Sequence, residues 1–329
     1  MLTLYSLKSG CLVPVDQPVI GPDVVWIDML NPTPDEERLV EAQTRLEVPT
    51  REEMKDIEAS SRIYEEGGVL YLTAVLVANA LEDDPKAEPV TFVLGRERLV
   101  TVRYCEPKSF PLFVSSCSRQ PILTHDARLV LLGLLQAIVE RAAEVLERVG
   151  GDLDALSRRV FRNNAGRGAP KGAARRRSTR PRADLQLVVE RIGENHDLVF
   201  KLRESLLSLQ RVVAFLGQRS GAAAYAGLLS DLRSDLASLS EYDEVLSAKV
   251  DFMLDATMGL INIEQNGIIK IFSVVSVIFM PPTLVASIYG MNFEWMPELR
   301  WPWGYPMALL MMLCAAILPY LYFKAKRWL

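Results

Sequence analysis

The stretch from Ile271 to Asn292 reads IFSVVSVIFMPPTLVASIYGMN, and the stretch from Trp301 to Phe323 reads WPWGYPMALLMMLCAAILPYLYF. They are 22 and 23 residues long, and neither contains a charged residue. A helix of about 20 apolar residues is long enough to cross the roughly 30 Å hydrocarbon core of a membrane. The two stretches therefore predict two C-terminal membrane spans and exclude a wholly soluble enzyme.

The charges that flank the spans predict their orientation. The last six residues, KAKRWL, carry three positive charges directly after the second span. The connection between the spans has a net charge of −1, from Glu294, Glu298 and Arg300. Lys and Arg are enriched on the cytoplasmic side, and the first ten residues contain no signal-peptide pattern. We therefore expect a multi-pass protein of the inner (plasma) membrane with both termini in the cytoplasm.

The composition argues against several kinds of site and partner. The 329 residues have a net charge of −4, so no overall basic field indicates a nucleic-acid partner. The cysteines and histidines are scattered, which gives neither a zinc-ligand spacing nor a disulfide framework, and we expect reduced cytoplasmic thiols. These residues are Cys11, Cys105, Cys117, Cys314, His125 and His196.

The N-terminal part, residues 1–125, predicts a cytoplasmic α/β domain whose strand order the sequence leaves open. Thr33, Pro34 and Glu36 form a capping-box pattern with Pro at the first helical position, which predicts a helix to about Leu46. Short runs rich in β-branched and aromatic residues predict strands. These runs cover residues 2–7, 24–28, 69–78, 90–94 and 99–104.

Residues 126–220 predict two antiparallel cytoplasmic helices joined by a basic tip, since apolar residues recur there at helical spacing. Residues 158–182 contain ten Lys or Arg and no acid. This segment fits a solvated turn between two helices. Contact with anionic membrane lipids is a sharper alternative, and a nucleic-acid arm fits less well.

A third helix is expected to begin after Gly221 and to run without a turn signal into the first span. About 70 residues at 1.5 Å each would extend for about 105 Å. The expected layout is a cytoplasmic stalk at 221–268, a first span at 269–291, an extracytoplasmic loop at 292–304, a second span at 305–323 and a basic cytoplasmic tail at 324–329.

One face of this third helix alternates polar and apolar residues at steps of three and four. Such a period indicates a bundle of parallel copies from other chains. The polar members could simply set the register of a packed bundle, or they could form rings in a pore, with the apolar members as dewetting gates. Two spans per chain cannot enclose a pore, so that reading requires an oligomer. The stripe consists of Asp255, Met258, Asn262, Asn266, Ile269, Phe272, Ser276, Met280, Thr283 and Ser287.

Pro281 and Pro282 would loosen the helix beside Met280, which suits a gate or a simple kink.

At the end of the first span, Gly290, Met291 and Asn292 are followed by Met-Pro-Glu-Leu, which ends at Leu299. This combination resembles the signature of the CorA family of magnesium transporters. The similarity extends back to the INIEQN sequence at 261–266 and covers roughly residues 225–329 closely. It implies a homopentamer in which each subunit has an α/β cytoplasmic domain, a long stalk helix that continues into the pore-lining first span, and an outer second span.

The resemblance also implies roles for individual residues. Gly290, Met291 and Asn292 would form the outer mouth, beside the acidic loop of Glu294 and Glu298. The implied pore-lining positions are Asp255, Asn266, Phe272 (an apolar constriction), Met280 and Thr283. Asp231 would be a regulatory carboxylate at the subunit interface that Mg²⁺ bridges to an acid of the next chain, with Glu58, Glu65 and Glu66 as candidates for that acid. Ser287 stands where some members have Gly.

These expectations combine into a function that is not enzymatic. They imply passive Mg²⁺ uptake driven by the membrane potential, with Co²⁺ and Ni²⁺ as further ions, and closure by regulatory Mg²⁺ in the cytoplasm. No Walker motif indicates ATP use. Zinc transport by the sister family of the same architecture is the alternative. A membrane-anchored sensor or enzyme is disfavoured, since an anchor needs no polar stripe.

Overall fold

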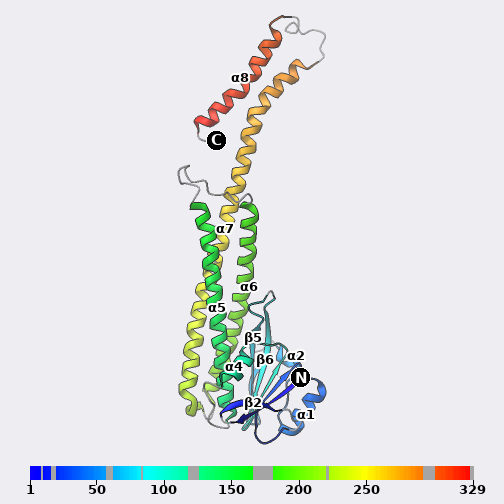
Figure 1. Ribbon diagram of the computed structural model, residues 1–329, viewed down its shortest axis with the longest axis vertical. Helices are drawn as coiled ribbons and strands as arrows, with labels where there is room; N and C mark the ends of the chain where they lie inside the picture. The colour runs from blue at the N-terminus through cyan, green and yellow to red at the C-terminus, as the bar shows by residue number, and fades with distance from the viewer. Residues whose placement is uncertain are drawn as a thin grey trace. The chain divides into compact units, whose positions relative to one another are not determined.

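The computed structural model describes residues 1–8, 10–15, 20–56, 62–82, 84–117, 126–165, 181–219, 222–291 and 301–326. The chain divides into two compact units (Figure 1). The first consists of Met1–Thr179 and Gln186–Leu254, and the second of Arg180–Leu185 and Asp255–Leu329.

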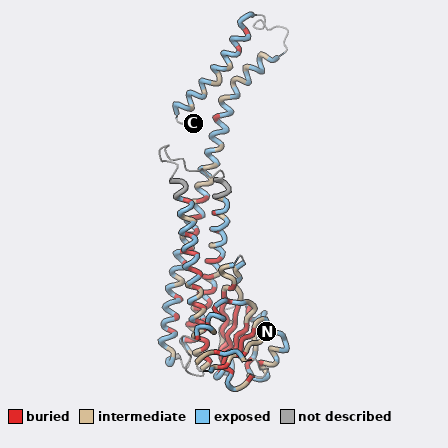
Figure 2. The backbone as a smooth tube through the Cα atoms, in the orientation of Figure 1, coloured by how far each residue is buried: buried red, intermediate tan, exposed pale blue. Residues whose placement is uncertain are grey.

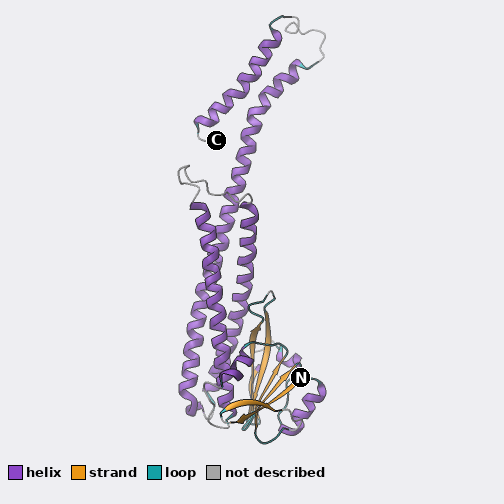
Figure 3. Cartoon of the chain, in the orientation of Figure 1, coloured by secondary structure: helices purple, strands orange, loops and turns teal. Residues whose placement is uncertain are grey.

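A seven-stranded mixed sheet forms the centre of the N-terminal domain (Figure 3). Its strand order is β2-β1-β3-β7-β6-β5-β4. All neighbours are antiparallel except β3 and β7, which run parallel. The strands are β1 (Leu2–Lys8), β2 (Cys11–Val15), β3 (Val24–Leu30), β4 (Ile63–Glu66), β5 (Val69–Ala78), β6 (Lys86–Leu94) and β7 (Leu99–Arg103).

Short helices cover one face of this sheet. Helix α1 (Pro34–Thr44) and helix α2 (Arg51–Met54) place Val40 and Met54 in a core cluster with Ile27 and Met29 of β3. Both helices begin with a complete capping box, in which Thr33 pairs with Glu36, and Thr50 with Glu53. Each box satisfies two backbone donors that a helix start otherwise leaves open.

The other sheet face packs on α4 (Ser109–Ser116), α5 (Ala127–Ala165) and α6 (Pro181–Gly217). Trp26 of β3 is fully buried there, stacked on Tyr5 at 4.5 Å and edge-on to Phe113 of α4 at 5.8 Å. Ser208 of α6 accepts a hydrogen bond from the Val75 backbone of β5 at 2.9 Å. The central strands β3, β5, β6 and β7 are therefore largely buried, as the red segments of the sheet in Figure 2 show.

Long helices make up the rest of the described chain. After a short 3₁₀ turn (Ala222–Tyr225), α7 runs unbroken from Ala226 to Tyr289, and α8 runs from Gly304 to Ala325. Both α7 and α8 contain a segment long and apolar enough to cross a membrane. Helix α7 passes through Pro281 and Pro282 without interruption, and its residues up to Leu254 belong to the first unit.

The structure confirms the helix from Thr33, the five predicted strands and the long helices after residue 126. The sequence did not reveal β2, β4, α2 or α4. Strand β2 contains Pro14, β4 ends in two glutamates, and both lie at sheet edges, where pairing does not require a long apolar run. The predicted basic tip falls largely on residues 166–180, which lie outside the described residues.

Candidate functional site

The predicted stripe forms one exposed face of α7. All ten stripe residues, from Asp255 to Ser287, are exposed in the chain. At about 100° per residue they fall within an arc of roughly 120° around the helix axis. Its large apolar members are among the most exposed of the described residues, with Phe272 at 69% and Met280 at 70%.

The opposite face of α7 is the one that the chain itself covers. Val274 is only 2% exposed, and Ile278, Pro281, Val285 and Tyr289 are half-buried. These five recur at steps of three and four, and the centre of their arc lies roughly opposite the centre of the stripe. Helix α8, the other apolar helix of this unit, runs in the opposite direction (Figure 1). The single chain leaves the stripe without cover, together with other apolar residues of α7 such as Ile271, Phe279 and Leu284.

Hydroxyl groups within the span bond back to their own helix. Thr283 donates to the Phe279 carbonyl at 2.7 Å, and Ser276 donates to the Phe272 carbonyl at 2.9 Å. A hydroxyl has one proton and two acceptor lone pairs. These side chains therefore present acceptors, and no free donor, on the exposed face.

Ser273 belongs with this set although the predicted stripe does not include it. Its hydroxyl donates to the Ile269 carbonyl at 2.9 Å, and its position falls within the same arc of the helix. Ser273 lies four residues after Ile269 and three before Ser276, so the same spacing fits it, but the predicted stripe included Phe272 at this turn instead.

Helix α7 ends where the signature sequence begins. The Gly290 backbone N–H donates to the Ala286 carbonyl at 2.9 Å, and that of Met291 donates to Ile288 at 3.3 Å. A Cβ at Gly290 would lie 3.1 Å from the Ala286 oxygen, which is tighter than an ordinary contact. Asn292, Glu294 and Glu298, which the sequence assigns to the mouth and its loop, lie outside the described residues.

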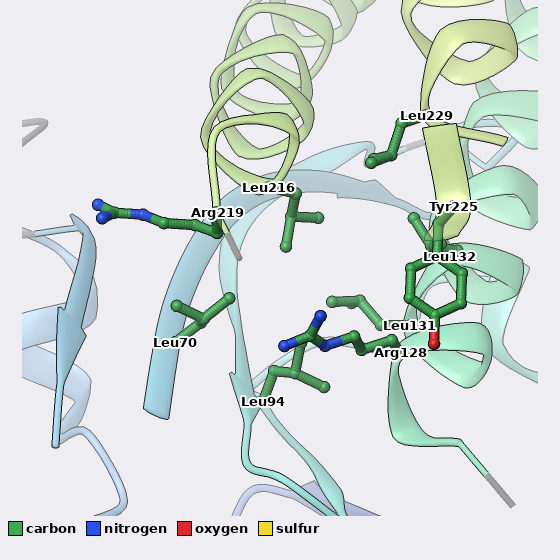
Figure 4. A pocket seen from close by; sticks show the side chains of 9 residues that line it. All are labelled: Leu70, Leu94, Arg128, Leu131, Leu132, Leu216, Arg219, Tyr225 and Leu229. Carbon is green, nitrogen blue, oxygen red and sulfur yellow. The ribbon is translucent and has the colours of Figure 1, made fainter. Parts of the chain in front are cut away.

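The proposed regulatory acids sit in different surroundings. Asp231 of α7 is exposed, as is Glu66, whereas Glu65 forms an ion pair with Arg219 at 3.1 Å and Glu58 lies outside the described residues. Figure 4 shows Arg219 pointing away from a leucine-lined pocket at the end of α6. Among the described residues, no three His, Cys, Asp or Glu side chains gather closely enough to hold a metal ion. The charge of Glu65 is thus compensated within its own chain.

Two ion pairs fix α7 to its neighbours within the first unit. Asp243 is 1% exposed, and its Oδ2 accepts from Arg203 Nε of α6 at 2.8 Å. Its Oδ1 is buried without a partner among the described residues. Burial raises the pKa of Asp243 despite the opposing effect of Arg203. Lys249 pairs with Asp154 of α5 at 2.7 Å and lowers the pKa of that carboxyl.

The chain was compared with known proteins. Residues 22–327 match the family model described as CorA-like Mg2+ transporter protein. The magnesium transport protein CorA of Escherichia coli (strain K12) is 37% identical over 336 residues, with full coverage of both chains.

Two solved structures share the fold. The complete CorA magnesium transporter from Methanocaldococcus jannaschii has a TM-score of 0.74 at 18% identity and covers 100% of this chain and 99% of its own. The cytoplasmic domain of ZntB from Vibrio parahaemolyticus has a TM-score of 0.56 at 8% identity, over 79% of this chain and 97% of its own. The family model and the full-length identity, together with the signature at the end of α7, show that this chain belongs to the CorA family.

Proposed function

We propose that this chain is one subunit of a homopentameric, channel-like Mg²⁺ uptake system of the inner membrane. The observation that carries this proposal is the stripe on α7, where polar and large apolar side chains alternate along one exposed face. A face of alternating polar and large apolar residues is costly to expose to lipid. Such a face is expected to line a shared axis.

Several copies are needed to close that axis. The described part of one chain has two helices that are long and apolar enough to cross a membrane, and two helices cannot enclose a pathway. In the proposed assembly, α7 of each copy lines the pore along residues 269–291, and α8 forms the outer ring that faces membrane lipids. The stalk at 221–268 then connects the pore to the cytoplasmic domain. The name of the E. coli relative, a magnesium transport protein, supports Mg²⁺ as the ion.

Hydrogen-bond polarity in the pore suits a hydrated cation. Mg²⁺ gives up its water ligands reluctantly, and the water molecules around a cation point their protons outward. Thr283 already uses its proton within the helix, so its oxygen can only accept. The amide oxygen of Asn292 would act in the same way at the mouth, with Gly290 and Met291 shaping the backbone there.

The remaining rings divide between polar sites and gates. Asp255 and Asn266 would accept from the water shell lower in the pore. Phe272 and Met280 would form apolar constrictions that close by dewetting. Glu294 and Glu298 would attract cations to the mouth, since an acidic rim concentrates counter-ions.

The membrane potential is sufficient to drive uptake. One charge that crosses 100 mV gains about 2.3 kcal/mol, so a divalent cation gains about 4.6 kcal/mol. At 1.36 kcal/mol per decade this supports about a thousandfold accumulation. ATP is therefore not required, and Co²⁺ and Ni²⁺, which share the charge, could use the same route.

Cytoplasmic Mg²⁺ would close the pathway at subunit interfaces. In this proposal Asp231 of one copy faces an acid of the next, and the two repel each other when no ion lies between them. Bound Mg²⁺ would bridge them and hold the ring in a symmetric, closed state.

Zinc transport is disfavoured, because the described stripe contains no His or Cys, the ligands that zinc prefers.

Flux into proteoliposomes tests the proposal. Purified chain is reconstituted, a negative internal potential is set, and Mg²⁺ entry is followed with an internal fluorescent indicator. We expect Asn292→Ala to reduce entry at least tenfold, while Asn195→Ala, the same truncation on α6, leaves it unchanged. Wild-type protein that passes no Mg²⁺ would overturn the function, and normal entry through Asn292→Ala would overturn the assignment of the mouth. The mass of the detergent-solubilised assembly tests the pentamer.

A further inference from the structure

The fold brings together two thiols that lie 106 residues apart in the sequence. Cys11 is the first residue of β2, and Cys117 directly follows α4. The Cys11 thiol donates to the backbone carbonyl of Cys117 at 3.7 Å. In return, the Leu12 backbone N–H donates to the Cys117 thiol. The Cys11 thiol thus contacts the Cys117 backbone, and the Cys117 thiol contacts the backbone of Leu12, the residue next to Cys11.

The two thiols differ in their access to solvent. Cys117 is 2% exposed, whereas Cys11 is half-buried on an edge strand of the sheet. Burial, together with the nearby Cys11, raises the pKa of the Cys117 thiol. A small solute can therefore reach Cys11, while Cys117 stays protonated and shielded behind it. This asymmetry is typical of a thiol that reacts first beside a thiol that resolves.

We propose that Cys11 and Cys117 form an oxidation site that closes to a disulfide when the protein meets a hydroperoxide. The Cys11 sulfur attacks the peroxide O–O bond, takes one oxygen as the sulfenic acid and releases water. The Cys117 thiol then attacks that sulfur, the S–S bond forms, and the hydroxyl leaves as a second water. Two thiols and one hydrogen peroxide give one disulfide and two waters.

The other two cysteines, Cys105 and Cys314, are not expected to take part in the disulfide. Burial raises the pKa of the Cys105 thiol to about 11, and the cysteine that contacts Cys11 is Cys117 rather than Cys105. Cys314 lies in α8, within the apolar span. The disulfide would tie the edge strand β2 to the end of α4 and leave the span untouched. Oxidation would therefore act on the N-terminal domain.

The test uses the full-length protein in detergent. The protein is reduced, freed of reductant, treated with hydrogen peroxide, alkylated and analysed by intact mass and peptide mapping. We expect a mass loss of about 2 Da, the two hydrogens of a disulfide, and a peptide that links Cys11 to Cys117. Matched variants Cys105→Ser and Cys314→Ser should form the same link at the wild-type rate.

The two partner variants separate the roles. Cys11→Ser should abolish the link and slow the loss of the Cys117 thiol about tenfold, because a buried thiol reacts slowly. Cys117→Ser should leave a sulfenic acid on Cys11 that a dimedone reagent traps. Since Cys117 is buried and its variant could unfold, Cys11→Ser at the sheet edge is the decisive variant. Four intact thiols after peroxide, or a disulfide between any other pair or between copies, would overturn the proposal.

Discussion

Arg203 Nε of α6 lies 2.8 Å from Asp243 Oδ2 of α7, and the carboxylate is almost completely buried. The guanidinium is partly open to solvent, with 39% of its side chain exposed. The contact therefore compensates a buried charge on the helix that continues as the first apolar span. Substitution of Arg203 and substitution of Asp243 should therefore lower the stability of the protein by different amounts.

Removal of Arg203 should destabilise the protein more than neutralisation of Asp243. Arg203→Ala leaves a buried carboxylate without its partner, which costs about 1–3 kcal/mol. Asp243→Asn removes the charge that burial already disfavours, so we expect a smaller change. Thermal unfolding of the full chain in detergent measures both, with Arg191→Ala, which breaks the exposed Arg191–Glu194 pair, as a control expected to be near neutral.

The pH dependence of this pair has a definite sign. Burial raises the pKa of Asp243 above its ordinary value of 3.8, so the folded state binds the proton more tightly than the unfolded state. The contribution of this group is then greatest at low pH and falls as pH rises from about 4 through the raised folded value. Arg203→Ala raises that pKa further, so acidification toward that value should recover part of the lost stability. A defect independent of pH would contradict this assignment.

Substitution of Thr283 tests the acceptor role of the stripe. Thr283→Val keeps the shape and removes the oxygen, and the loss of one hydrogen bond of about 0.5–1.5 kcal/mol predicts a decrease in Mg²⁺ flux of about twofold to twelvefold. Val285→Thr places the same hydroxyl on the covered face and should leave flux near the wild-type rate. Equal effects of the two substitutions on Mg²⁺ flux into proteoliposomes would contradict the assignment of the stripe to the pore.

Gly290 should not tolerate a side chain. The Cβ of Gly290→Ala would lie 3.1 Å from the Ala286 oxygen, so this oxygen would have to move by a few tenths of an ångström at the end of α7. We expect a clear loss of flux without loss of the folded protein. Gly193→Ala, where no atom lies within 4 Å of the added Cβ, should be as active as wild type and slightly more stable, by about 1 kcal/mol. Full activity of Gly290→Ala would mean that the helix end is not constrained.

Asp231 is expected to set the response to cytoplasmic Mg²⁺. Asp231→Ala removes one ligand charge from the proposed interface site, and ligand charge sets cation affinity. The Mg²⁺ concentration that protects the cytoplasmic domain from protease should rise several-fold. Glu190→Ala removes an exposed acid of α6 and should leave that concentration unchanged. Identical protection curves for Asp231→Ala and wild type would exclude this residue from the site.

Several parts of the fold follow from short-range patterns in the sequence. The charge-free runs at 271–292 and 301–323 indicate apolar helices because backbone groups in lipid must be satisfied within the segment. The Thr33–Glu36 capping box is complete within four residues. The stripe on α7 has a helical period, so its common face follows from helix geometry alone.

The strand order and the contacts between distant segments do not follow from short-range patterns in the sequence. The order of the strands places β7 beside β3, although β4 to β6 lie between them in the sequence. The Glu65–Arg219 pair joins residues that no local pattern connects. Ser273 and Phe272 both fit the spacing between Ile269 and Ser276, so spacing alone did not show that the two residues share the same broad face.

The sequence by itself determined the two apolar helices, the long helix with its mixed stripe, and the signature at its end, because each depends on spacing within a single segment. Only the tertiary structure decided which face of α7 is covered, that Arg203 meets Asp243, and that Cys11 meets Cys117. These contacts join segments 40 to 106 residues apart. Their formation depends on how whole elements pack, and packing is set by the sum of many weak contacts rather than by any local pattern.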